Sequence, residues 1–222
     1  MINIHPQYKK ARNFHKSAFT MLELIMVIVV LGILASLALP RMERDLRQEA
    51  GDNILSAIRY TQHLALMDNK TDPDDSNWQQ EYWQIRFSTG ASFFYIIASN
   101  IGHADNIPKG ATAIDPANGR YMHNVNADTT IGNDESPNIF IGKKYSINSL
   151  THRGGCSRSQ HIAFDHLGRP HTNIYNAGND FASYMKRDCI LTFGFEDTSI
   201  TDLVIRISKE TGYAQIVDQN AS

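Results

Sequence analysis

Glu23 is the only charged residue in the otherwise apolar run of residues 19–39. At a rise of about 1.5 Å per residue, a helix over this run would cross the roughly 30 Å hydrocarbon core of a bilayer. A charged side chain inside such a helix costs about 2.5–3.5 kcal/mol on insertion scales. The carboxylate therefore calls for a functional reason.

Four histidines follow one another in the second half of the chain, but their spacing does not predict a metal site. His161, His166 and His171 are evenly spaced, and His152 lies close before them. Metal sites on strands favour i, i+2 pairs or residues that meet across a hairpin, and this spacing requires neither. We expect polar loop and strand-edge histidines and no bound metal.

The other motifs do not predict catalysis. No Ser/His/Asp set has a recognisable nucleophile elbow, and Gly154-Gly155 is not a phosphate loop. The acidic stretch of residues 72–75 lacks the ligand spacing, the glycine and the distant glutamate of a calcium loop, so we expect a solvated turn. We expect neither an enzyme nor a cofactor.

Residues 143–187 form a basic segment with seven Lys or Arg residues against two Asp residues. Such a segment is typical of a patch that contacts DNA phosphates. An ordinary mixed surface, whose charges scatter on folding, explains the same composition, and we favour it. The candidate DNA contacts are Arg153, Arg158, Lys186 and Arg187.

The N-terminus carries a basic leader before the apolar run. Four of the 21 basic residues and none of the 23 acidic residues lie in residues 1–18, so the rest of the chain has a net charge of −6. The positive-inside rule then places the leader in the cytoplasm and the body across the membrane. A secretory signal peptide cleaved after residues 35–38 and a plain uncleaved anchor are two interpretations of this pattern, but neither explains Glu23.

A third interpretation accounts for Glu23. The string of residues 16–23, KSAFTMLE, resembles the type IV prepilin signal. The resemblance implies that prepilin peptidase cuts between Ala18 and Phe19 and that Phe19 is then N-methylated. The family usually has glycine before the cut, where this chain has Ala18, and this departure bears on processing efficiency.

The resemblance also gives roles to Glu23 and Pro40. In a filament of packed helices the carboxylate of Glu23 would pair with the charged N-terminal amine of a neighbouring subunit and fix the axial register. A Glu23 side chain that reaches the lipid headgroups from a shallow position is the simpler alternative. Pro40 occupies position 22 of the mature chain, where we expect a helix kink or break near the membrane exit.

Two cysteines, Cys156 and Cys189, lie in the body of the chain. In an oxidising periplasm we expect them to form a disulfide, which would stabilise the fold by about 3–4 kcal/mol in the chain-entropy model. Two separate buried thiols are the alternative.

Beyond Pro40 the pattern predicts that the helix continues to Met67, with Ile54, Ile58, Thr61 and Ala65 on its apolar face. The period then changes to two, and residues 100–137 are typical of a long loop. We expect strands at Tyr82–Phe87, Phe93–Ala98, Asn138–Gly142, His161–Asp165, Ile190–Glu196, Asp202–Ser208 and Tyr213–Val217.

Two strings sharpen the resemblance. Residues 162–169, IAFDHLGR, and residues 203–213, with LVIRIS followed by TGY, are similar to segments of minor pseudopilins of the H type. The resemblance implies an α+β, type IV pilin-like fold in which a long N-terminal helix packs on a C-terminal antiparallel β-sheet.

The domain boundaries follow from these elements. We expect a cleaved leader at 1–18, a transmembrane and assembly helix at 19–39, its continuation at 40–70 and a periplasmic β-rich domain at 71–222. The predicted protein is a minor pilin or pseudopilin, held in the inner membrane by a single span before it enters a secretion pseudopilus or a pilus. Its expected partners are prepilin peptidase, other pilins and the inner membrane. A DNA-binding pilin, or an anchored periplasmic protein unrelated to pili, are the alternatives.

Overall fold

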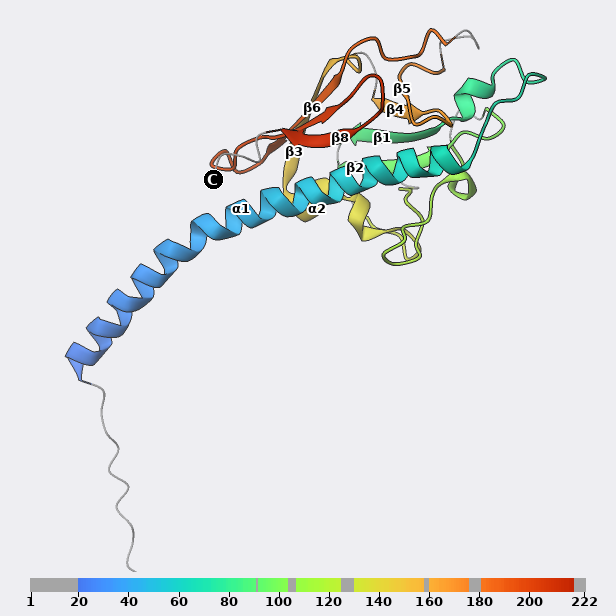
Figure 1. Ribbon diagram of the computed structural model, residues 1–222. Helices are drawn as coiled ribbons and strands as arrows, with labels where there is room; N and C mark the ends of the chain where they lie inside the picture. The colour runs from blue at the N-terminus through green and yellow to red at the C-terminus, as the bar shows by residue number, and fades with distance from the viewer. Residues whose placement is uncertain are drawn as a thin grey trace, which may run out of the picture. The chain divides into compact units, whose positions relative to one another are not determined.

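Helix α1 (Met21–Met67) is the longest element of the computed structural model (Figure 1). The structure describes residues 20–90, 92–103, 107–124, 130–157, 160–175 and 181–217, with the side chains of residues 36–45 left out. The chain divides into two compact units, Met1–Met42 and Glu43–Ser222, and α1 contributes residues to both.

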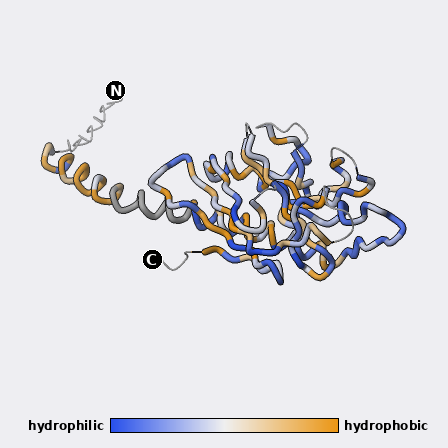
Figure 2. The backbone as a smooth tube through the Cα atoms, turned by 90° about the horizontal axis from the view of Figure 1, so that it is seen from above, coloured by the Kyte–Doolittle hydropathy of each residue, from blue (hydrophilic) through white to orange (hydrophobic). Residues whose placement is uncertain are grey.

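In the first unit, α1 is an apolar helix (Figure 2). Helical backbone continues through Pro40 without interruption, so α1 is not broken there. The kink at Pro40 stays a prediction.

In the second unit, α1 buries one face. Ala50, Ile54, Ile58, Thr61 and Ala65 are each no more than 1 % exposed. Their spacing of three or four residues places them on one side of the helix, which confirms the predicted apolar face. The hydroxyl of Thr61 donates to the carbonyl of Ala57 at 2.8 Å, so this polar side chain is buried without an unpaired donor.

Eight strands form two antiparallel sheets. One sheet has the order β2-β1-β4-β5 and comprises β1 (Trp83–Thr89), β2 (Phe93–Ser99), β4 (His161–Phe164) and β5 (Pro170–His171). The other has the order β3-β6-β7-β8 and comprises β3 (Ile147–Gly154), β6 (Cys189–Phe195), β7 (Leu203–Ile207) and β8 (Ala214–Val217).

The main hydrophobic core joins α1 to both sheets. Ile58 of α1, Ile85 of β1 and Leu191 of β6 belong to it, and all three are fully buried. Alternation places these side chains inward: in β7, for example, Leu203, Ile205 and Ile207 are buried while the residues between them are not. The architecture is therefore α+β, with the helix packed on antiparallel sheets, and a type IV pilin-like arrangement fits it.

One predicted strand is wrong. Residues 138–142 run from the 3₁₀ helix η3 (Pro137–Ile139) through Phe140 into the short helix α2 (Ile141–Tyr145). Ser136 caps η3 by accepting a hydrogen bond from the N–H of Asn138, and Pro137 at the first position favours a helical start. This local signal outweighs the apolar residues that suggested a strand.

Other elements were not expected. Strand β3 is not among the predicted strands, because it is largely polar. The strands form two sheets, where the prediction had one. The 3₁₀ helix η1 (Trp78–Glu81) precedes β1, and η2 (Lys109–Ala111) lies inside the predicted long loop.

A disulfide joins Cys156 to Cys189, as predicted. Both cysteines are fully buried, and their Cα atoms lie 5.1 Å apart. The bond ties the turn after β3 to the first residue of β6, and it closes a loop with a sequence separation of 33 residues.

Candidate assembly and binding sites

Glu23 lies in the first turn of α1. Thr20 holds this turn from the N-terminal side, because its hydroxyl accepts the N–H of Glu23 at 3.3 Å and its carbonyl accepts the N–H of Leu24 at 3.2 Å. The free N–H groups and the positive end of the helix dipole favour a carboxylate at this place. Ala18 and Phe19, the predicted cleavage residues, lie outside the described part of the chain.

The helix that follows Glu23 exposes its apolar side chains. The large hydrophobic residues between Met21 and Leu34 are 45–81 % exposed. A contiguous apolar surface of this kind marks a site of contact with a protein or a membrane. Across the described residues, we find no helix with a segment both long and apolar enough to span a membrane. The transmembrane assignment of residues 19–39 stays a prediction.

Comparison with known proteins identifies this segment. Residues 13–39 match the family model of the prokaryotic N-terminal methylation motif. The match supports the type IV pilin or pseudopilin class. This class is processed by prepilin peptidase, assembles into pili and is generally non-enzymatic. Comparison with the curated proteins and with the solved structures gave no match.

The two strings of residues 162–169 and 203–213 meet on α1. The amide of Gln62 donates to the carbonyl of Gly168, in the turn after β4, and to the carbonyl of Thr211, in the turn before β8, both at 2.8 Å. Gly168 and Gly212 adopt positive φ angles of 76° and 66°, which favour glycine. Both turns lie in strings that the sequence singles out, but Gln62 does not, because nothing in the helical pattern distinguishes its amide from other surface polar groups.

In the structure, most basic side chains of residues 143–187 lie at separate places and do not form one patch. Lys144 pairs with Glu49 at 3.3 Å, and Arg169 pairs with Asp165 at 2.7 Å. Arg158 lies outside the described residues. Among the candidate contacts, Lys186 and Arg187 come together along an open groove of about 670 Å³ that Gly154 and Gly155 also line.

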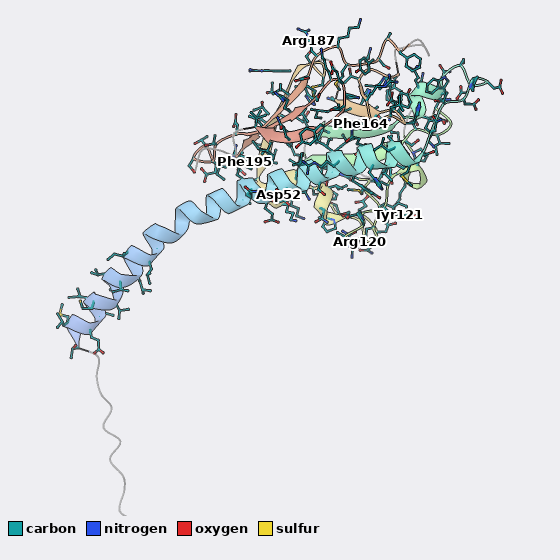
Figure 3. The ribbon with its side chains drawn as sticks, viewed as in Figure 1. Asp52, Arg120, Tyr121, Phe164, Arg187 and Phe195 are labelled. Carbon is teal, nitrogen blue, oxygen red and sulfur yellow. A yellow bond between two sulfur atoms is a disulfide. The ribbon has the colours of Figure 1, made fainter. Side chains whose placement is uncertain are left out.

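Arg153 precedes Gly154 at the end of β3, opposite Ile190 of β6. In Figure 3, Arg187 lies at the outer edge of the domain, away from α1. The position of Lys186 and Arg187 therefore makes them accessible to a large anion, while the pairing of Lys144 and Arg169 removes two charges from the patch.

Of the four histidines noted above, His171 is the most buried. It is fully buried in the edge strand β5, with Nδ1 2.9 Å from the hydroxyl of Ser183 and Nε2 3.4 Å from the carboxylate of Asp165. The residue types are those of a hydrolase triad, but Asp165 is bound by the guanidinium of Arg169, and the hydroxyl of Ser183 donates to Gln79 at 3.3 Å. These contacts of Asp165, His171 and Ser183 connect β4 and β5 to Gln79 of η1.

Burial determines the charge of His152 and His161. Burial, together with the nearby Arg86, lowers the pKa of His161 to about 4, and burial lowers the pKa of His152. Both are therefore neutral at neutral pH. Among the described residues, the four histidines do not form a three-ligand metal group.

Proposed function

We propose that this chain is a minor pilin or pseudopilin that prepilin peptidase cuts between Ala18 and Phe19 and that is then N-methylated at Phe19. The observation that carries the proposal is the methylation motif at residues 13–39, which includes the exposed apolar surface of the first part of α1. The mature protein assembles through this helix into a type II secretion pseudopilus or a type IV or competence pilus.

The predicted domain plan belongs to the same proposal. Residues 1–18 are the cytoplasmic leader, residues 19–39 hold the precursor in the inner membrane, residues 40–70 continue the helix, and residues 71–222 form the periplasmic domain. The second half of α1 packs its buried face on the core of the folded domain.

Glu23 acts in assembly. Cleavage before Phe19 creates a positively charged amine beside an apolar helix, and an isolated charge is costly among packed helices. A carboxylate one turn along a neighbouring helix offsets that cost, and the pair fixes the register of adjacent subunits.

The test is assembly of the Glu23→Ala variant. We expect normal membrane insertion but strongly reduced filament incorporation, measured by cross-linking of subunits in cells that express the assembly machinery. Glu49→Ala, which removes an exposed carboxylate from the other half of α1, should assemble normally. Normal incorporation of Glu23→Ala would contradict the register role.

A DNA-binding pilin is the second candidate, and the groove beside Lys186 and Arg187 supports it. Phosphate contacts make affinity fall with salt, so neutralising Lys186, Arg187, Arg153 and Arg158 should weaken DNA binding and flatten its salt dependence. Lys209→Ala removes a lysine outside the segment and should change neither. Equal affinity and salt slope for the quadruple variant and the wild type would exclude this function.

A further inference from the structure

Three side chains from separate segments converge beyond the C-terminal end of α1. Asp75 lies in the turn that follows α1, Glu81 ends η1, and His103 lies in the turn after β2. The Nε2 atom of His103 is 2.8 Å from Oδ2 of Asp75 and 3.9 Å from Oε1 of Glu81. One ligand atom from each residue lies within 4.8 Å of the other two.

Hydrogen bonds hold the two carboxylates in place. Oδ1 of Asp75 accepts the N–H of Asn77 at 2.8 Å, which leaves Oδ2 directed at His103. Oε1 of Glu81 accepts the N–H of Gly102 at 2.9 Å, so this carboxylate is anchored to the turn that carries His103. Ligands oriented in this way need little rearrangement to bind an ion.

The charges of the cluster do not balance. Two carboxylates face one ring nitrogen, which can hydrogen-bond to one of them and whose imidazole carries at most one positive charge. Asp72 and Asp74 add negative charge next to Asp75 in the sequence. A divalent cation at the point of convergence would balance the two carboxylates while binding the nitrogen.

The spacing suits a small ion. Ligand atoms at about 2.0–2.2 Å from a tetrahedral zinc ion lie about 3.3–3.6 Å from one another. The 2.8 Å and 3.9 Å separations bracket this range, so side-chain shifts of less than an ångström would complete the site. The three side chains are 20–30 % exposed, which gives an ion a path from solvent.

We propose that Asp75, Glu81 and His103 bind a divalent transition-metal ion, with Zn²⁺ as the ion of choice. The nitrogen ligand favours Zn²⁺ over Ca²⁺ and Mg²⁺, which prefer oxygen. Three protein ligands leave a fourth position for water. The bound ion links the turn after β2 to η1 and to the turn after α1, and thus stabilises this end of the domain.

Zn²⁺ binding by the full-length chain in detergent tests the proposal, by competition with a chromophoric chelator. We expect one site whose affinity falls more than about tenfold in His103→Ala and in Glu81→Gln. His63→Ala, which removes an exposed histidine of α1, should bind as the wild type does. Because both cysteines are in the disulfide, thiols do not contribute.

Thermal unfolding gives the second readout. Zn²⁺ should raise the melting temperature of the wild type and of His63→Ala, EDTA should reverse the rise, and Glu81→Gln should show a smaller rise at the same Zn²⁺ concentration. Glu81→Gln keeps an oxygen for the Gly102 N–H, so it carries the test if His103→Ala does not fold. No Zn²⁺ site in the wild type, a preference for Ca²⁺, or unchanged affinity in Glu81→Gln would overturn the proposal.

Discussion

At the residue scale, Asp165 shows how one polar side chain holds several segments together. Its carboxylate is fully buried and binds the guanidinium of Arg169, the ring of His171 and the N–H groups of Leu167 and Arg169. Burial alone would raise the pKa of Asp165, but these hydrogen bonds and charges outweigh it and lower the pKa to about 2. A buried carboxylate with this many donors stabilises the turn only while it is ionised.

The free energy of unfolding should therefore depend on Asp165 in acid. Because the pKa is lower in the folded state than its unfolded value of about 3.9, the stabilisation is complete above that value and is lost as the pH falls toward 2. Urea unfolding at a series of pH values should show a loss of about 2 kcal/mol over this range. Asp165→Asn should be less stable at pH 7 and lack this part of the acid dependence. The same acid dependence in Asp165→Asn would contradict the assignment.

Gly212 is a second residue whose replacement gives a clear prediction. Its φ is positive, and an added Cβ would overlap the carbonyl oxygen of Gly168. Gly212→Ala should lower the free energy of unfolding by more than about 3 kcal/mol. Gly119 also has a positive φ but open space around the Cβ position, so Gly119→Ala should cost only about 1–2 kcal/mol. Equal costs in chemical denaturation would show that the close approach at Gly212 is unimportant.

At the scale of elements, the second half of α1 organises the domain. Its buried stripe contacts a core that includes strands of both sheets, and Gln62 fastens the two glycine turns to it. Through Gln62, α1 holds the turn after β4 in one sheet and the turn before β8 in the other. This explains how two sheets pack on a single helix.

Gln62→Glu tests this fastening. A carboxylate cannot donate to the carbonyls of Gly168 and Thr211, so both lose a partner, and we expect a loss of about 2–3 kcal/mol in the free energy of unfolding. His63→Ala, the neighbouring exposed position, should be nearly neutral. Urea denaturation of the two variants at pH 7 provides the comparison. A neutral Gln62→Glu would mean that the turns dock without the amide.

The elements differ in how well the sequence predicts them. The apolar face of α1 and the β1–β2 hairpin follow from clear periods of 3.6 and two residues. Strand β3 lacks that signal, since its only large apolar residues are Ile147 and Leu150, and its pairing with β6 comes from tertiary contacts. The convergence of Asp75, Glu81 and His103 is likewise a product of the fold, because 28 residues separate Asp75 from His103.

At the scale of the whole molecule, the chain combines a domain with a well-formed core and an apolar helix that exposes its side chains. The domain contains a disulfide, which is typical of proteins in an oxidising compartment such as the periplasm. The helix carries the methylation motif at its start. Both features fit the proposed periplasmic domain and the proposed assembly helix.

The disulfide should contribute substantially to stability. For a loop of this length, the chain-entropy model gives about 3–4 kcal/mol. We expect Cys156→Ser with Cys189→Ser to lower the free energy of unfolding by this amount in chemical denaturation. Dithiothreitol should destabilise the wild type similarly and leave the double variant unchanged. If dithiothreitol did not change the denaturation of the wild type, even in denaturant that exposes the disulfide, the expected contribution of the disulfide would be contradicted.

The central claim is that the mature protein begins at Phe19. Intact-mass and N-terminal analysis of the chain, expressed with and without a prepilin peptidase, tests it most directly. We predict that the peptidase converts the precursor to a chain of residues 19–222 that is one methyl group heavier than its sequence, with methylated Phe19 at its N-terminus. A mature chain that starts at Leu39, or one that keeps Met1 in the presence of the peptidase, would contradict the account.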